Sequence, residues 1–315
     1  MRPQGVRVEW GEVAAHVRDE VASALGSPVV QAQNQPGGFS PGVAARCQLA
    51  DGRRYFIKAV SSDQNPDSPG IHRREARTTA ALPRALPVPS LLHVVDDGHW
   101  VVLVFEEIDG RAPSLPWSIP ELRAAFAALD ELAEATTPCP IPGLPSFGEL
   151  QASTFNGYRT LEAGDGSALE RIDAWSRRHL TRLAELEAGW AAAAHGASLL
   201  HADLRADNLL VRPDGTFVVV DWPNACVGAA WVDKLCMLPS VGLDGGPTPI
   251  VVEDVLEPFA GIDADAVNHV LVAVAGYFTY QGIQSDPPGL PTVRAFQRSQ
   301  GELARAWLAH RLVLE

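Results

Sequence analysis

The first third of the chain alternates short apolar runs with polar turns. Two pairs of such runs each flank an Asp-Gly turn, a pattern typical of β-hairpins. The paired runs are Val43–Leu49 with Tyr55–Val60, and Val94-Val95 with Trp100–Phe105. Apolar side chains at helical spacing predict a helix over Trp10–Leu25 and another from about His72 to Leu82. After the first helix we therefore expect the order strand, strand, helix, strand, strand.

From Pro120 onward the pattern becomes helical. The expected helical stretches are Pro120–Ala135, Ala168–Ala194, Ala264–Gln281 and Thr292–Leu312, with further helix after Ala230. One pair of short strands, Asn208–Val211 and Phe217–Val220, interrupts them around a Pro-Asp-Gly turn. The β-rich part gives way to helices near Asp109-Gly110, so we expect an N-terminal lobe over residues 1–109 and a C-terminal lobe over 110–315.

Composition narrows the class of protein. The 315 residues are 46% hydrophobic and 20% charged, enough apolar material for a sizeable core and too much for a disordered chain. The formal net charge of -13 disfavours binding to nucleic acid or to anionic membranes. The four cysteines lie far apart without metal-ligand spacing, and no apolar run reaches the length of a membrane span. We expect a cytoplasmic protein with reduced thiols.

The charge is unevenly distributed along the chain. Residues 1–109 carry 11 basic and 13 acidic side chains, a net of -2, whereas residues 110–315 carry 14 and 25, a net of -11. An acidic C-terminal lobe would attract a cationic small molecule. An acidic, solvated surface that serves solubility is the competing interpretation of the same numbers.

One motif carries specific chemistry. His201 and Asp203 begin an H-x-D-x-x-x-x-N sequence that ends at Asn208, and Asp221 follows the predicted hairpin. Phosphoryl transfer needs a carboxylate near the attacking hydroxyl and oxygen ligands that hold magnesium against the nucleotide phosphates. Asp203, Asn208 and Asp221 supply these groups. The competing interpretation, that His201 and Asp203 only cap a turn or helix, does not account for Asp221.

With these residues the chain resembles the aminoglycoside phosphotransferase family, small-molecule relatives of the protein kinases. The resemblance implies a protein-kinase-like bilobal α+β fold, with a β-rich N-terminal lobe and a mainly helical C-terminal lobe. It implies ATP and Mg²⁺ as cofactors, Asp203 as the catalytic base, and Asn208 and Asp221 as metal ligands. His201 matches the position that braces the loop, and a hydrogen-bonded core histidine is the role we expect for it.

The resemblance extends to the nucleotide-binding lobe. Lys58, one of only two lysines against 23 arginines, ends the strand Tyr55-Phe56-Ile57 and matches the lysine that binds the ATP phosphates. Glu75 matches the helix glutamate that orients it, so we expect the two within about 4 Å. The Gly-rich stretch around Gly37, Gly38 and Ser40 matches the phosphate-covering loop, although an ordinary hairpin turn would have the same composition. Glu106 and Ile108 match the hinge whose backbone binds adenine.

The chain departs from the protein-kinase pattern after Asp221, where Trp222-Pro223 replaces Phe-Gly. Proline fixes the backbone there, which argues against a mobile switch. Further along, Asp233 is expected to cap the helix that carries Leu235 and Met237, a structural role.

These observations predict an ATP-dependent O-phosphotransferase that acts on a hydroxyl of an aminoglycoside or a similar amine-bearing molecule, with a role in antibiotic resistance. A metabolic kinase for a sugar, macrolide, choline or amino alcohol is the alternative within enzymes. A catalytically inert nucleotide-binding module is the alternative outside them. The sequence leaves open the acceptor, the choice between ATP and GTP, and the oligomeric state.

Overall fold

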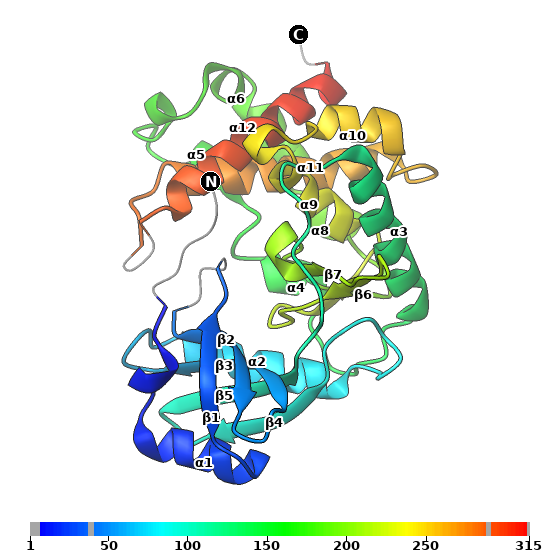
Figure 1. Ribbon diagram of the computed structural model, residues 1–315. Coiled ribbons are helices and arrows are strands. Elements are labelled where there is room, and N and C mark those ends of the chain that lie inside the picture. Colours follow the sequence, from blue (N-terminus) through cyan, green and yellow to red (C-terminus); the bar gives the residue numbers. More distant parts are fainter. Residues whose placement is uncertain (1–6, 37–40, 288–290, 314–315) are drawn as a thin grey trace. The chain divides into compact units, whose positions relative to one another are not determined.

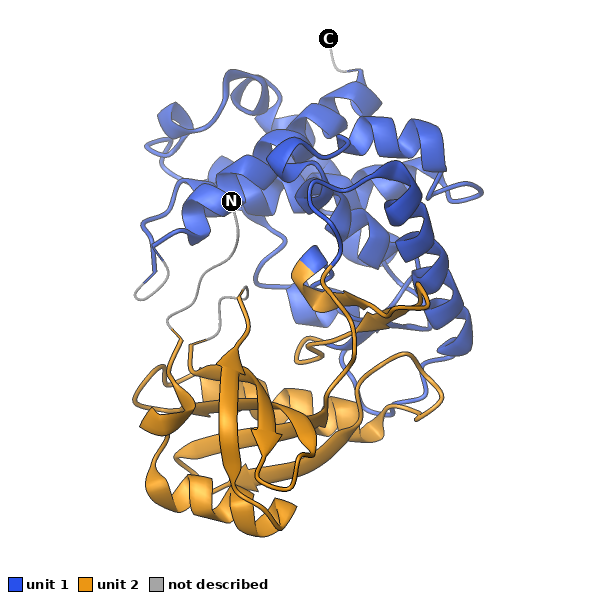
Figure 2. Ribbon diagram, in the orientation of Figure 1, with its two compact units in different colours: residues 1, 113–206, 225–315 blue, residues 2–112, 207–224 orange. Residues whose placement is uncertain are grey.

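The computed structural model describes residues 7–36, 41–287 and 291–313. The chain forms two compact units, coloured separately in Figure 2. Unit 2 comprises Arg2–Ala112 together with Asp207–Asn224, and unit 1 comprises Pro113–Ala206 together with Ala225–Glu315. The short segment 207–224 therefore groups with the N-terminal part of the chain, although it lies far along the sequence.

Unit 2 contains a five-stranded antiparallel sheet in the order β1-β2-β3-β5-β4 (Figure 1). Its strands are β1 (Val29–Asn34), β2 (Val43–Leu49), β3 (Arg54–Ser61), β4 (Leu91–Asp96) and β5 (Trp100–Glu106). Its helices are η1 (Trp10–Glu12), α1 (Ala15–Leu25) and α2 (Ser68–Ala81). The two predicted hairpins are present. The helix predicted over Trp10–Leu25 is divided into η1 and α1 by the extended backbone of Val13, and the helix predicted from about His72 begins earlier, at Ser68. The edge strand β1 was not predicted, because its side chains are mostly exposed and follow no clear alternation.

Both faces of the sheet are covered, which explains the unbroken apolar run in β5. Val102 and Val104 pack with α1 residues Val17 and Val21 in one buried cluster. The alternate β5 side chains Val101, Leu103 and Phe105 form a second cluster, against which Ala76 of α2 packs. Successive side chains of a strand point to opposite faces, so a strand covered on both sides is apolar at every position.

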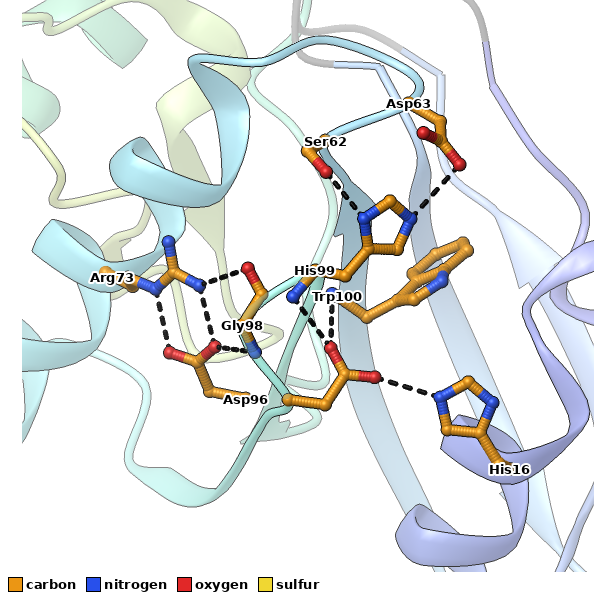
Figure 3. Close-up of polar contacts among 9 residues, drawn as sticks. His16, Ser62, Asp63, Arg73, Asp96, Gly98, His99 and Trp100 are labelled. Carbon is orange, nitrogen blue, oxygen red and sulfur yellow. Dashed lines mark hydrogen bonds and ion pairs between the residues drawn. The ribbon is translucent and has the colours of Figure 1, made fainter.

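Polar contacts tie the β4–β5 turn to its surroundings (Figure 3). Asp97 accepts hydrogen bonds from the His99 and Trp100 backbone amides and from His16 of α1. The Arg73 guanidinium of α2 donates two hydrogen bonds to Asp96, at 2.8 and 2.7 Å. The hydrogen bond from His16, together with the two amides, lowers the pKa of Asp97 to about 2. One turn thereby connects the sheet to α1 and to α2.

The segment 207–224 forms the hairpin of β7 (Leu209–Val211) and β8 (Phe217–Val219), close to the predicted strands. Backbone bonds join it to the rest of unit 2: Arg111 and Val211 exchange two, and the Val219 amide donates to the Pro87 carbonyl. Gly110 permits this approach, since a Cβ there would lie 3.0 Å from the Val211 carbonyl oxygen. These bonds explain why the hairpin belongs to the same compact unit as the sheet.

Unit 1 is mainly helical. Its helices are α3 (Ile119–Ala135), α4 (Phe147–Gln151), α5 (Gly157–Ala163), η2 (Leu169–Arg171), α6 (Ala174–Arg178), α7 (Leu180–Glu187), α8 (Trp190–Ala193), α9 (Val232–Val241), η4 (Leu243–Gly245), α10 (Pro249–Leu256), α11 (Ala264–Gly282) and α12 (Val293–Leu312). Its strands β6 (Ser198–Leu200) and β9 (Cys226–Gly228) pair antiparallel and were not predicted. The short η3 (Ala206–Asn208) spans the boundary with unit 2.

The helical stretch expected over Ala168–Ala194 is broken into four pieces. Asp173 caps α6 by accepting a hydrogen bond from the Ser176 amide, which starts a new helix there. His179 has non-helical dihedrals between α6 and α7, and Gly189 precedes α8. Capping residues inside an apolar periodic pattern therefore divide a stretch that composition alone predicts to be one continuous helix.

Helix α11 forms the centre of unit 1 and is buried along most of its length. It packs against α12 and crosses α5 where two glycines meet. A Cβ on Gly157 would lie 2.0 Å from the Gly276 carbonyl oxygen. None of the helices in the described ranges is long and apolar enough to cross a membrane.

We expect Gly157→Ala to destabilise the protein by about 1–3 kcal/mol, because the added methyl forces α5 away from α11. Gly11→Ala is the matched control, since a Cβ there has no neighbour within 4 Å, and its effect should stay within about 0.5 kcal/mol. Urea unfolding of both variants measures the difference. Equal unfolding midpoints would contradict the packing argument.

Candidate active site

The centre of the site in unit 2 is the Lys58 ammonium. Lys58 lies on β3, paired in register with Ala44 on β2 and Leu103 on β5. Strand alternation turns Ile57 toward the α1 cluster and Lys58 toward the α2 face. There its Nζ donates to Glu75 Oε1 and to Asp221 Oδ1, each at 2.7 Å. The expected ion pair between Lys58 and Glu75 is present.

Burial gives these ion pairs their strength. The Glu75 and Lys58 side chains are 2% and 16% exposed, while that of Asp221 is 35% exposed. Burial opposes the charge on Lys58, but the two carboxylates outweigh it and raise the Lys58 pKa. Burial raises the pKa of Glu75 to about 7, with Lys58 opposing and Asp221 adding to the shift. The lysine therefore stays charged, and the cluster holds more negative than positive groups.

Asp221 occupies an unusual backbone conformation. It follows β8 with a φ of 70°, in the left-handed region that non-glycine residues seldom adopt. Just before it, the Val220 amide donates to the Asn208 carbonyl at 3.0 Å, so the hairpin brings the Asn208 and Asp221 positions together within unit 2. Left-handed non-glycine residues cluster at functional sites, where the surrounding structure compensates for the strain. A strained backbone at Asp221 is consistent with a carboxylate whose direction matters for the site.

Two further basic groups lie near this carboxylate, and the sequence motifs did not indicate either. His72 lies one turn before Glu75 on α2 and is buried, and burial together with Lys58 lowers its pKa to about 4. Arg7 forms a backbone bridge with Gly42, and Asp221 acts electrostatically on its guanidinium. Arg7 belongs to a segment without any local motif, so only the fold could have revealed it.

The H-x-D loop in unit 1 is held by a buried carboxylate. Asp233 accepts hydrogen bonds from the backbone amides of His201 at 2.7 Å and Ala202 at 2.8 Å. Burial raises the pKa of Asp233, and His201 and the two amides partly oppose the shift. The expectation that Asp233 caps α9 is wrong, because that helix begins at Val232 with Trp231 at its N-cap position. Its structural role is to anchor the loop instead.

The anchored loop fixes Asp203. His201 is 1% exposed, and its Nδ1 accepts a hydrogen bond from the Asp203 amide at 3.2 Å, so it braces the loop as expected. Ala202 between them has a φ of 60°, a second left-handed residue at a motif position. The Asp203 carboxylate pairs with Arg205 at 2.7 Å. The backbone around Asp203 is thus determined by contacts within unit 1.

The structure describes some of the remaining residues expected at the site and leaves others outside the described ranges. Gly37, Gly38 and Ser40 lie outside the described residues. Glu106 ends β5, where its amide donates to the Ser90 carbonyl, and Ile108 is buried. Trp222, in place of the kinase phenylalanine, is fully buried and donates to the Val219 carbonyl at 3.0 Å.

A cavity of about 320 Å³ adjoins the hinge segment, lined by residues 106–109 and 212–214. We do not assign the nucleotide to it. Carboxylates outnumber guanidinium groups in its lining, even though Arg54 pairs with Glu107 at 2.8 Å from outside it, and this charge would repel phosphates.

A sheet whose lysine is held by a helix glutamate, followed by a helical part that contains an H-x-D loop, defines the protein-kinase-like class of fold. Within that class, the chain belongs to the phosphotransferase enzyme family, whose model matches residues 37–256. The motif that ends at Asn208, Asp221 and the sheet from β2 onward all fall inside the matched range. No curated protein matches the chain.

Solved structures of small-molecule kinases share the fold. A thermostable mutant of the aminoglycoside phosphotransferase APH(4)-Ia, in ternary complex with AMP-PNP and hygromycin B, matches with a TM-score of 0.59 at 13% identity, covering 95% of this chain and 98% of that one. The choline kinase LicA from Streptococcus pneumoniae matches with a TM-score of 0.58 at 13% identity, covering 95% and 98%. An aminoglycoside-3'-phosphotransferase of type VIII matches with a TM-score of 0.53 at 18% identity, covering 83% and 99%. Identities this low establish the fold and leave the acceptor open.

We expect Asp233→Ala to destabilise the protein by about 2–5 kcal/mol, because it leaves one buried and one half-buried amide without an acceptor. Asp165→Ala is the control, since Asp165 is exposed and bonds only locally, to Ser167. Hydrogen exchange gives the specific measurement: the His201 and Ala202 amides should lose protection in the first variant alone. Retained protection of both amides would contradict the anchoring role.

Proposed function

We propose that this chain is an ATP-dependent O-phosphotransferase that transfers the γ-phosphate to a hydroxyl of a small molecule. The observation that carries the proposal is the buried Lys58 ammonium, held at 2.7 Å by both Glu75 and Asp221. Burying a charged cluster costs free energy. This cluster leaves the Lys58 ammonium beside the partly exposed Asp221 carboxylate, an arrangement that suits a phosphate ligand. Family membership and the nucleotide-bound structural neighbours support the same conclusion.

In the proposed mechanism Lys58 binds the nucleotide phosphates, and Glu75 keeps its ammonium in place. Asn208 and Asp221 would hold Mg²⁺ through an amide and a carboxylate oxygen, the ligand type that this hard cation prefers. Magnesium usually keeps one or two protein ligands and completes its shell with phosphates and water, so two residues are sufficient. When bound, the metal would neutralise charge on the transferring phosphoryl group.

Asp203 is the proposed catalytic base. The acceptor oxygen would attack the γ-phosphorus, forming a new O–P bond while the bond to the bridging oxygen breaks and ADP leaves. The hydroxyl proton would pass to the Asp203 carboxylate. Asp233 and His201 support this role because they fix the backbone of the loop, and positioning accounts for much of catalysis in phosphoryl transfer.

For the acceptor, the net charge of the C-terminal part supports an amine-bearing molecule such as an aminoglycoside, and a role in resistance and a cytoplasmic location would accompany it. The structural neighbours include enzymes crystallised with hygromycin B and a choline kinase, both consistent with a small hydroxylated ligand. A metabolic kinase for a sugar, macrolide or amino alcohol is the alternative that this fold supports equally well.

Asp203→Asn should lower turnover by at least about 100-fold, because it removes the proton acceptor while keeping the shape of the side chain. The affinity for Mg·ATP should stay at the wild-type value. Asp214→Asn, in the exposed β7–β8 turn, is the control and should leave both quantities unchanged. Wild-type turnover in Asp203→Asn would overturn the proposed base. Mg·ATP binding without turnover in the wild-type protein, across a broad acceptor panel, would favour the inert module.

Removing a metal ligand should weaken Mg·ATP binding by about 10-fold or more. Asn208→Ala is the cleaner variant, because Asp221→Ala also removes a partner of Lys58. Titration calorimetry with and without magnesium makes the test specific: in EDTA, Asn208→Ala should bind ATP as weakly as the wild-type protein does. Unchanged Mg·ATP affinity for both variants would show that the metal lies elsewhere.

A further inference from the structure

A cluster of three polar side chains in unit 2 lies outside the residues assigned to nucleotide binding. The His99 Nδ1 atom is 2.7 Å from Ser62 Oγ, and the His99 Nε2 atom is 3.1 Å from Asp63 Oδ2. Figure 3 shows both side chains directed at the His99 ring, one at each nitrogen. A serine, a histidine and an acid bonded in this order form the arrangement that activates a serine hydroxyl for nucleophilic attack.

The antiparallel ladder between β3 and β5 brings the serine and the histidine together. Its last pair is Ser61 with Trp100. Beyond this pair the Ser62 amide still donates to the His99 carbonyl, at 3.1 Å. Residues directly opposite each other in such a ladder have Cβ atoms about 5 Å apart, so a hydroxyl can reach an imidazole. A turn begins at Ser62, and it carries the Asp63 carboxylate to the other ring nitrogen.

The surrounding contacts fix the His99 imidazole and leave it accessible. Asp97 Oδ1 accepts hydrogen bonds from the backbone amides of His99 at 2.9 Å and Trp100 at 2.6 Å. The Trp100 ring lies 6.5 Å from the His99 ring, at an interplanar angle of 76°. The His99 side chain is 45% exposed and that of Asp63 is 83% exposed. A small molecule in solvent can therefore reach the oriented imidazole.

The two partners determine which nitrogen of His99 carries the proton. An ionised carboxylate only accepts hydrogen bonds, so the proton lies on Nε2, toward Asp63. In the neutral imidazole Nδ1 then has a lone pair, and the Ser62 hydroxyl donates to it. Compared with the Ser-His-Asp triad of serine proteases, the two ring nitrogens exchange partners. An ion pair between His99 and Asp63 alone would stabilise the turn weakly, whereas the Ser62 contact adds a base beside a nucleophilic oxygen.

We propose that Ser62 is a modification site that takes an acyl group from an activated ester or thioester, with His99 as its base. The Ser62 oxygen attacks the carbonyl carbon and forms a C–O bond, while its proton moves to His99 Nδ1. The bond to the leaving oxygen or sulfur then breaks, and His99 returns the proton to that group. An uncharged acyl donor fits the site better than a nucleotide, because the adjacent Asp63 carboxylate repels phosphates.

The same geometry indicates a single modification rather than turnover. The Ser62 amide already donates to the His99 carbonyl, so it does not stabilise a tetrahedral oxyanion as the nucleophile's own amide does in serine proteases. The acceleration therefore comes from the base, a factor of about 100. None of the three residues belongs to the proposed nucleotide or metal site, so the inference is independent of the proposed phosphotransferase.

The acyl probe is p-nitrophenyl acetate, reacted with the full-length protein. Peptide mass spectrometry at successive times gives the acetylation rate of each serine separately. We expect Ser62 to be acetylated about 100-fold faster than Ser23, the contribution of a positioned general base. Ser23 is the internal control, because it is an exposed serine of α1 whose side chain makes no hydrogen bond with any described residue.

Variants then assign the reactivity to the cluster. His99→Gln should lower the Ser62 rate about 100-fold, to the Ser23 level, because glutamine is polar but is not a base. Asp63→Asn should lower it about 10-fold, since an amide that donates to Nε2 favours the tautomer with the proton on Nδ1. Asp67→Asn is the matched control: Asp67 lies in the same loop, and its side chain does not cap α2. It should keep the wild-type rate, and all three variants should keep the wild-type urea midpoint.

Equal acetylation of Ser62 and Ser23 would overturn the proposal. A Ser62 rate that survives His99→Gln would also overturn it, since the imidazole would then not be the base. A parallel incubation with Mg·ATP tests the donor class, because phosphorylation of Ser62 without acetylation would contradict an acyl donor. Ser62→Ala should keep the wild-type affinity for Mg·ATP, and a loss of that affinity would connect Ser62 to the nucleotide site and overturn its separate role.

Discussion

The buried contact between Lys58 and its two carboxylates is the constraint on which the nucleotide-binding unit depends. Removing one partner of such a cluster leaves an uncompensated buried charge, at a cost of about 3–5 kcal/mol. The contact requires β3 to present Lys58 on the α2 face, α2 to aim Glu75 at it, and the β7–β8 hairpin to bring Asp221 from 163 residues away. Three elements must be in register for it to form, so the sheet, the helix and the hairpin make one unit.

In unit 1 a buried carboxylate also fixes the local structure, but its partners are different. There the Asp233 carboxylate is buried against backbone amides. It fixes the direction of the loop and has no proposed contact with a ligand. Asp203 can then remain partly exposed while its backbone is fixed. The left-handed dihedrals of Ala202 and Asp221 fit the same division, since such strain persists where surrounding contacts over-determine the backbone. Each unit thus fixes its own residues of the proposed site, Lys58 and Asp221 in unit 2 and Asp203 in unit 1.

Sequence patterns predicted those parts of the fold that local physics determines. The hairpins around β2–β3 and β4–β5 follow from alternation and turn residues, and the Lys58–Glu75 contact followed from family resemblance. Edge strand β1 was not predicted because its exposure removes the hydrophobic pattern. The breaks between α6, α7 and α8 were not predicted because a cap is a local hydrogen bond inside an apolar repeat. Asp233 was misassigned because its acceptor role depends on a loop 31 residues away. Arg7 belongs to no motif, and only packing brings it to its neighbours.

Net charge over a whole lobe does not describe the charges that lie beside Asp203. A count over 110–315 sums groups that water screens from one another, since the Debye length is only about 8 Å at physiological ionic strength. A ligand at Asp203 responds mainly to nearby charges, and in unit 1 these include the Arg205 guanidinium, 2.7 Å from Asp203, and the Asp233 carboxylate that holds the adjoining backbone. The acidic surface acts at longer range, where it concentrates cations of any kind and adds little selectivity. In the proposed mechanism, acceptor specificity therefore depends on the few oriented groups close to Asp203, and the overall charge serves solubility and encounter.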